Sequence, residues 1–124
     1  METRSSVRAA INIYARLNID DGFEQKISLP VDAKLRVNVV SISSLGMGFL
    51  CTSVLPKGLK VKIDMPGDDF GISGNINLSG EIRYCRQVTI SSYNCGLKFI
   101  DISPDHKAGI LRYVSLHSSE KRKS

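Results

Sequence analysis

Within the stretch GLKVKIDMPG at 58–67, residues 59–65 alternate strictly between apolar and charged side chains. The apolar members of the series are Leu59, Val61, Ile63 and Met65, and the charged members are Lys60, Lys62 and Asp64. Successive side chains of a β-strand point to opposite faces, so this period of two places the apolar groups on one face and the charges on the other. The segment is therefore predicted to be a strand with one buried face.

Related strand signals return along most of the chain. They occupy residues 11–19, 34–43, 46–53, 72–85 and 95–102. Turn-forming residues separate these segments, among them the Asp20-Asp21-Gly22 run and the SSYN stretch at 91–94. Gly80 lies inside one of the alternating series, where it predicts a bend or a bulge.

The period changes after residue 102. Ser103 suits a helix N-cap, Pro104 suits the first helical position, and Asp105 suits the positive end of the helix dipole. An apolar stripe then runs over Ile110, Leu111 and Val114 to about Leu116. Six short strands followed by one helix predict a mainly β fold: a small antiparallel six-stranded barrel, with the C-terminal helix covering one open end or flank.

Length and charge place limits on the class of protein. The 124 residues suit a single domain, and the net charge is +5. The last seven residues, SSEKRKS, contribute +2 and contain no apolar group, so residues 118–124 are predicted to be a disordered tail. The remaining +3 favours anionic partners only mildly, which makes nucleic acid an unexpected partner.

Cysteine usage indicates a cellular compartment. The three cysteines, Cys51, Cys85 and Cys95, are odd in number and form no C-x-x-C, which argues against a disulfide framework or a zinc site and favours a reducing cytoplasm. Arg8, Asn12 and Arg16 interrupt any secretory apolar region, and no stretch is long enough to span a membrane. A soluble cytoplasmic protein without membrane insertion is expected.

Catalytic patterns are missing from the sequence. Its two histidines, His106 and His117, have the local context of exposed residues, and Asp68 and Asp69 lie in a turn-like PGDDFG stretch. No Ser/His/Asp order, G-x-S-x-G or metal-ligand spacing is present. We expect no enzyme, no catalytic residue, no metal and no cofactor.

Two short segments carry binding chemistry. RSSVR, residues 4–8, places Arg4 and Arg8 just before the first strand. In VVSISSLGMGF, residues 39–49, Ser41 and Ser43 share one strand face, and Gly46 would permit a positive-φ turn that brings the backbone close to a ligand. Taken singly, the first could be a solvated terminus and the second a serine-rich hairpin turn.

Together, the two segments resemble the motifs of the PilZ domain, a bacterial receptor module for cyclic di-GMP. Arg4 and Arg8 match its R-x-x-x-R, and Ser43 and Gly46 match the end of its (Asp/Asn)-x-Ser-x-x-Gly. The closing segment CGLKFIDISPDHKAGILRYV is similar to the last strand and Ser-Pro-capped helix of the family. The resemblance covers nearly the whole chain and implies a PilZ-type barrel that binds cyclic di-GMP through Arg4, Arg8, Ser41, Ser43 and Gly46.

Ser41 departs from the family pattern, which has Asp or Asn at this position. The acid or amide is expected to help hold a guanine edge, and a lost charge-assisted hydrogen bond is worth about 1.5–3 kcal/mol, or roughly tenfold to a hundredfold in affinity. Serine still offers a donor and two acceptor sites. Weakened rather than abolished binding is therefore expected.

The resemblance implies a receptor that converts second-messenger level into altered shape or altered binding of a downstream protein. Residues 1–8 would form a flexible arginine segment, 9–117 the barrel with its helix, and 118–124 the tail. Two alternatives stay open: a PilZ-fold protein–protein adaptor with little ligand affinity, and a basic barrel for single-stranded nucleic acid. The last requires exposed stacking aromatics, yet Phe49, Phe99 and Tyr84 are expected in the core, leaving only Tyr14 and Tyr93.

Overall fold

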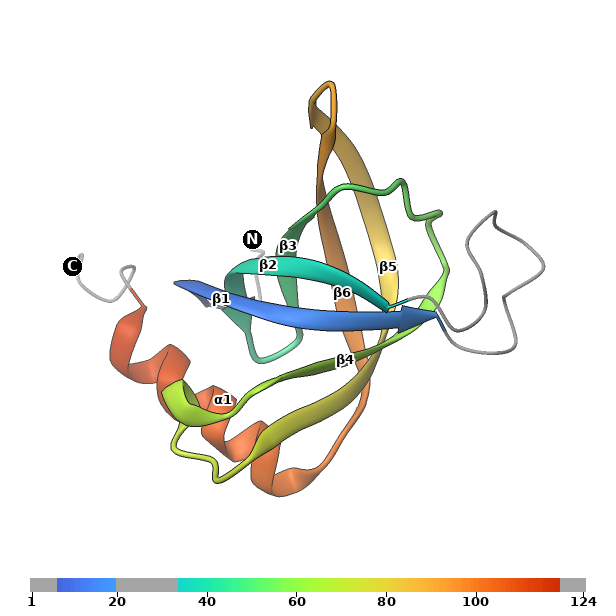
Figure 1. Cartoon of the computed structure of the whole chain (residues 1–124). Helices are drawn as coiled ribbons and strands as arrows, with labels where there is room; N and C mark the ends of the chain where they lie inside the picture. Colours follow the sequence, from blue (N-terminus) through green and yellow to red (C-terminus); the bar gives the residue numbers. More distant parts are fainter. Residues whose placement is uncertain (1–6, 20–33, 119–124) are drawn as a thin grey trace, which may run out of the picture.

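The computed structural model describes residues 7–19 and 34–118, which form an antiparallel β-barrel with one C-terminal helix (Figure 1). Its elements are β1 (Arg8–Ile19), β2 (Lys34–Ser43), β3 (Gly46–Cys51), β4 (Lys60–Pro66), the 3-10 turn η2 (Asp68–Phe70), β5 (Asn75–Thr89), β6 (Ser92–Ile102) and α1 (Pro104–His117). The six strands close in the order β1-β2-β3-β6-β5-β4. The predicted fold class is confirmed.

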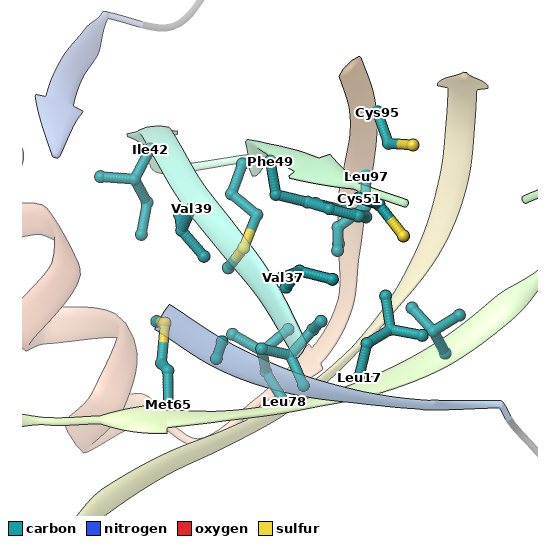
Figure 2. Packing of buried hydrophobic residues seen from close by; sticks show 14 of the residues in the cluster. Leu17, Val37, Val39, Ile42, Phe49, Cys51, Met65, Leu78, Cys95 and Leu97 are labelled. Carbon is teal, nitrogen blue, oxygen red and sulfur yellow. The ribbon is translucent and has the colours of Figure 1, made fainter. Parts of the chain in front are cut away.

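Alternating side chains build the core of the barrel. In β4, Val61, Ile63 and Met65 are buried while Lys60 and Lys62 are exposed, as the sequence period predicts. Figure 2 shows Leu17, Val39, Phe49 and other apolar side chains from several strands directed into the barrel. Burying each large apolar side chain contributes about 1.5–3 kcal/mol, so this shared interior is the main force holding the strands in one closed sheet.

The β5–β6 hairpin is longer than the sequence analysis predicted. SSYN at 91–94 was expected to be the turn, but the turn comprises residues 90–91, and Ser92 already pairs with Thr89. The Thr89 and Ser92 hydroxyl oxygens lie 2.8 Å apart and join the strand ends. Figure 1 shows this hairpin extending well past its neighbours. The bulge expected at Gly80 is present, as a register shift between Ser79 and Gly80.

Helix α1 covers one end of the barrel (Figure 1). Ser103 caps it, its Oγ accepting a hydrogen bond of 3.3 Å from the backbone N–H of His106. Ile110 and Val114 are buried against the barrel. The predicted stripe is too wide, because Leu111 and Leu116 are 43% and 73% exposed.

Polar contacts fix α1 to the first strand. The Tyr113 hydroxyl donates to the carbonyl oxygen of Ala10 at 2.9 Å, and Ser118, just beyond the helix, forms a β-bridge with Ala9. The first strand begins at Arg8, and the last residue that pairs with it is Ser118. Each of these residues lies one position outside the range 9–117 that was expected for the barrel domain. The predictions for the rest of the N-terminal segment and of the tail fall on residues 1–6 and 119–124, outside the described residues.

Candidate functional site

Arg8 and Ser41 are brought together at the end of the barrel where β1 starts. The Arg8 side chain is exposed, and its Nη2 donates a hydrogen bond of 3.1 Å to Ser41 Oγ. The strand register explains this, since Arg8 pairs with Ser43 and Ala10 pairs with Ser41, so that Ser41 is diagonal to Arg8. Two of the residues predicted from the sequence thus form one contact across the β1–β2 ladder.

Gly48 leaves the space in which this contact forms. It pairs with Ser41 across the β2–β3 ladder, and a Cβ at Gly48 would lie 2.8 Å from Ser41 Oγ and 3.9 Å from Arg8 Nη2. A larger residue would push the hydroxyl or the guanidinium aside. The sequence analysis did not identify Gly48, because nothing in its local pattern shows which side chains it faces.

Ser43 builds the turn between β2 and β3. Its side chain is fully buried, and its Oγ accepts hydrogen bonds of 3.2 Å from the backbone N–H groups of both Leu45 and Gly46. The same hydroxyl donates to the Gly46 carbonyl at 3.3 Å. Ser41 is partly exposed whereas Ser43 is fully buried, so only the Ser41 hydroxyl lies at the surface that the two serines were expected to share. Direct ligand contact by Ser43 stays a prediction.

Gly46 is required for a reason other than the one expected. Within residues 7–19 and 34–118, positive φ occurs only at Gly58, Gly71 and Gly74, so the predicted positive-φ turn at Gly46 is wrong. A Cβ at Gly46 would instead overlap the carbonyl oxygen of Leu97 on β6. Glycine lets β3 approach β6 closely, which places the β2–β3 turn against the residues of β6.

A shallow depression of about 160 Å³ lies beside Arg8. Its lining comes from β1, the β2–β3 turn, β5 and β6: Arg8, Leu45, Gly46, Met47, Arg83, Tyr84, Gly96, Leu97 and Lys98. Three of these residues are cationic and none is acidic. The surface around Arg8 is therefore suited to an anion.

Tyr84 contributes an aromatic side chain to this surface. It is 36% exposed, contrary to the expectation that it belongs to the core. Its ring lies against Gly96, where a Cβ would overlap it, and the Arg86 guanidinium carbon lies 4.7 Å from the ring centroid. A register shift between Ile82 and Tyr84 turns the side chain outward. The alternation of apolar residues in β5 predicted a Tyr84 side chain directed into the core. The prediction failed because the sequence does not reveal the bulge that reverses this direction.

Other candidate sites have less specific chemistry. Arg4, the remaining predicted site residue, lies outside the described residues. Two larger hollows, of about 520 and 450 Å³, share Arg16 and Asp64 in their linings and combine both charge signs. Neither includes Arg8, so the sequence motifs and the cationic surface point to the smaller depression.

The two histidines lie in different environments. His106 is half-buried rather than exposed as expected, and its Nδ1 is shielded from solvent without a hydrogen-bond partner. His117 is exposed and stacks on Tyr113, with ring centroids 4.2 Å apart.

In the described ranges, His, Cys, Asp and Glu form no cluster of three or more that could hold a metal ion. No helix in that part of the chain is long and apolar enough to cross a membrane.

A family model covers nearly the whole of this chain. The family model of the PilZ domain matches residues 2–116. A search of curated proteins finds no match.

Three solved structures share the fold. The Bacillus subtilis inhibitor of motility (MotI/DgrA) has a TM-score of 0.75 at 13% identity, covering 99% of this chain and 55% of its own. The PilZ domain of YcgR from Escherichia coli with c-di-GMP has a TM-score of 0.68 at 17% identity, covering 98% and 96%. MrkH of K. pneumonia has a TM-score of 0.66 at 16% identity, covering 100% and 52%. The chain thus spans about half of two of these proteins and nearly all of the YcgR domain.

Proposed function

The chain belongs to the PilZ domain family, and we propose that it binds cyclic di-GMP on the cationic surface beside Arg8. One observation carries the proposal: the Arg8 guanidinium, held by Ser41 at 3.1 Å, borders a depression that also contains Arg83, Lys98 and the exposed Tyr84. A structural relative of similar length, the YcgR domain, was solved with c-di-GMP. The family is one of receptor and binding domains rather than enzymes.

The chemistry of the ligand fits these side chains. Cyclic di-GMP has two phosphates and two guanines, and an arginine fork can bind the O6 and N7 acceptors of guanine with two hydrogen bonds. Arg8 has the required exposure, and Lys98 and Arg83 would neutralise phosphate charge. Arginine also stacks on aromatic faces, and the Arg86–Tyr84 pair already forms such a stack at the edge of the site.

Ser41 sets the expected strength of binding. Its neutral hydroxyl orients Arg8 by a single hydrogen bond from the charged guanidinium, where a carboxylate would form an ion pair with two acceptor oxygens. The ion pair is the stronger interaction, so Arg8 is less firmly preorganised than with Asp at this position. We expect binding to occur but to be weaker than an Asp at position 41 would give.

The ligand would lie on an open surface. Enclosed small-molecule pockets measure about 300–1,000 Å³, whereas the depression beside Arg8 measures about 160 Å³. A second cationic group would have to cover the exposed side of the ligand. Arg4, four positions before Arg8, lies outside the described residues, and we propose its side chain as the source of that group.

Ligand binding would give this receptor domain its output. Bound cyclic di-GMP would alter the surface around Arg8 that a downstream protein partner reads, and we propose that this occurs in the cytoplasm. A protein–protein adaptor without ligand is the second candidate. The exposed tip of the β5–β6 hairpin, where Val88 and Ile90 are 56% and 91% exposed, favours it as a partner contact.

Calorimetric titration of the full chain distinguishes these functions. Cyclic di-GMP is titrated first, and single-stranded RNA of equal phosphate concentration serves as the comparator. Saturable binding of cyclic di-GMP alone supports the receptor. Absence of binding to both leaves the adaptor, and binding of RNA with strong salt dependence would indicate a nucleic-acid module.

A further inference from the structure

The three cysteines, far apart in the sequence, converge at one place in the fold. Cys51 ends β3, Cys85 lies in β5 and Cys95 lies in β6. Cys95 is paired with Phe49 on β3 and directly with Cys85 on β5. Figure 2 shows Cys51 and Cys95 on the same side of the apolar core. All three are free thiols.

Cys85 and Cys95 form a close pair within this group. The Cys95 thiol donates to Cys85 Sγ across 3.3 Å. An S–S bond measures about 2.05 Å, so the two sulfurs need to approach by only roughly 1 Å, which rotation about the side chains can supply. The direct cross-strand register means that no backbone slip is required to join them.

The two thiols differ in access and environment. Cys85 is partly exposed, follows Tyr84 in the cationic part of β5, and its Sγ also accepts the Leu55 N–H at 3.4 Å. Cys95 is fully buried, and burial raises its thiol pKa, with the hydrogen bond to Cys85 adding to the effect. Reactive cysteines are partly exposed and lie in electropositive surroundings. Cys85 is the thiol that an oxidant in solution reaches, and Cys95 is reached only through Cys85.

We propose that Cys85 and Cys95 are a thiol–disulfide site that a peroxide oxidises. The Cys85 thiol loses its proton, and the thiolate attacks one peroxide oxygen. The O–O bond breaks, Cys85 becomes a sulfenic acid, and the departing hydroxide takes up the proton that the thiol lost and leaves as water. Cys95 sulfur then attacks Cys85 sulfur; the S–O bond breaks, the S–S bond forms, and the departing hydroxide takes the Cys95 proton to leave as water. Two thiols and one hydrogen peroxide thus give one disulfide and two waters.

Cys51 is the natural internal control. It is 2% exposed, and burial raises its pKa, which keeps it in the protonated, unreactive form. Its Sγ accepts a hydrogen bond of 3.4 Å from the Ser53 N–H. A thiol that is present, close and shielded should survive oxidation of the other two.

The disulfide would form on the rung next to the candidate ligand site. Tyr84 pairs with Gly96, and Cys85 pairs with Cys95 on the following rung of the same ladder. Cross-linking this rung would fix the β5–β6 spacing beside Tyr84. Formation of the disulfide is itself independent of any ligand at Arg8, so failure of one proposal does not imply failure of the other.

Peptide mapping of the full chain tests the site. The reduced protein is treated with a small excess of hydrogen peroxide, the remaining thiols are alkylated, and the chain is digested with trypsin. Cleavage after Arg83, Arg86 and Lys98 separates Cys85, in residues 84–86, from Cys95, in residues 87–98. Before alkylation, the intact chain should be lighter by two hydrogen atoms than the reduced chain. After alkylation, only Cys51 should carry the label. The two peptides should stay joined until a dithiol reductant is added.

Three variants complete the experiment. Cys51→Ser should form the linked peptides at the parental rate, while Cys85→Ser and Cys95→Ser should form none. Mapping of the parent chain alone suffices if a variant does not fold. Four results would each overturn the proposal: retention of all three thiols, a disulfide that includes Cys51, a disulfide between two chains, or oxidation of Cys85 without a disulfide.

Discussion

The ring of Tyr84 lies against the backbone of Gly96, in space that a Cβ at position 96 would occupy. This contact pairs β5 with β6 next to Arg8 and exposes one aromatic side chain beside Arg83 and Lys98. It depends on the register shift that follows Ile82, which turns Tyr84 away from the core. The cationic surface therefore rests on an irregularity in β5 as much as on the arginine motif.

Gly96→Ala tests this contact. The added methyl must displace the Tyr84 ring, which should lower the free energy of unfolding by about 1–3 kcal/mol. In a Tyr84→Ala background the obstacle is gone, and the same substitution should have a much smaller effect. Urea unfolding of the parent, both single variants and the double variant gives the coupling energy. Additive effects would show that the two residues do not share this space.

Ser43→Ala should destabilise the β2–β3 turn. The Leu45 and Gly46 N–H groups would lose their buried acceptor, and an unsatisfied buried donor costs about 1–3 kcal/mol. Ser44→Ala is the matched control, because this neighbour is partly exposed and should change stability by less than about 0.5 kcal/mol. Equal urea midpoints for the two variants would contradict the turn-building role of Ser43.

Ser41→Asp should tighten cyclic di-GMP binding by roughly tenfold to a hundredfold, because a carboxylate would form an ion pair with Arg8, which a neutral hydroxyl cannot, and would face the guanine. Ser41→Ala should act in the opposite direction, since it removes the acceptor. Dissociation constants from calorimetry measure both. Unchanged or weaker binding by the Asp variant would mean that Ser41 does not occupy the guanine-facing position.

Much of the fold is predictable from local sequence. The alternation of β4 and the Ser103-Pro104 helix start specify their elements directly, because side-chain period and capping chemistry are local properties. The length of the β5–β6 hairpin is not local. It follows from cross-strand pairing such as Cys85 with Cys95, which keeps residues 92–94 in the ladder despite their turn-like composition.

The candidate site is less predictable than the fold. Arg8 and Ser41 are found from their motifs and meet in space, but Gly48 and Tyr84 belong to the site through strand register and a bulge. Gly46 is important for its close approach to Leu97 rather than for its dihedral freedom. In each case the missing information is which side chain faces which across a ladder, and only the closed barrel supplies it.

The most direct test of cyclic di-GMP binding beside Arg8 is a calorimetric titration of Arg8→Ala against Arg36→Ala. Arg36 is an exposed strand arginine stacked on Tyr14, with its guanidinium carbon 4.2 Å from the ring centroid, and it does not line the depression. Both variants lose one positive charge, so general electrostatic attraction is matched. The account predicts that Arg8→Ala weakens cyclic di-GMP binding at least about tenfold, the loss of one charge-assisted hydrogen bond or more, while Arg36→Ala binds like the parent. Equal dissociation constants for Arg8→Ala and the parent would contradict it.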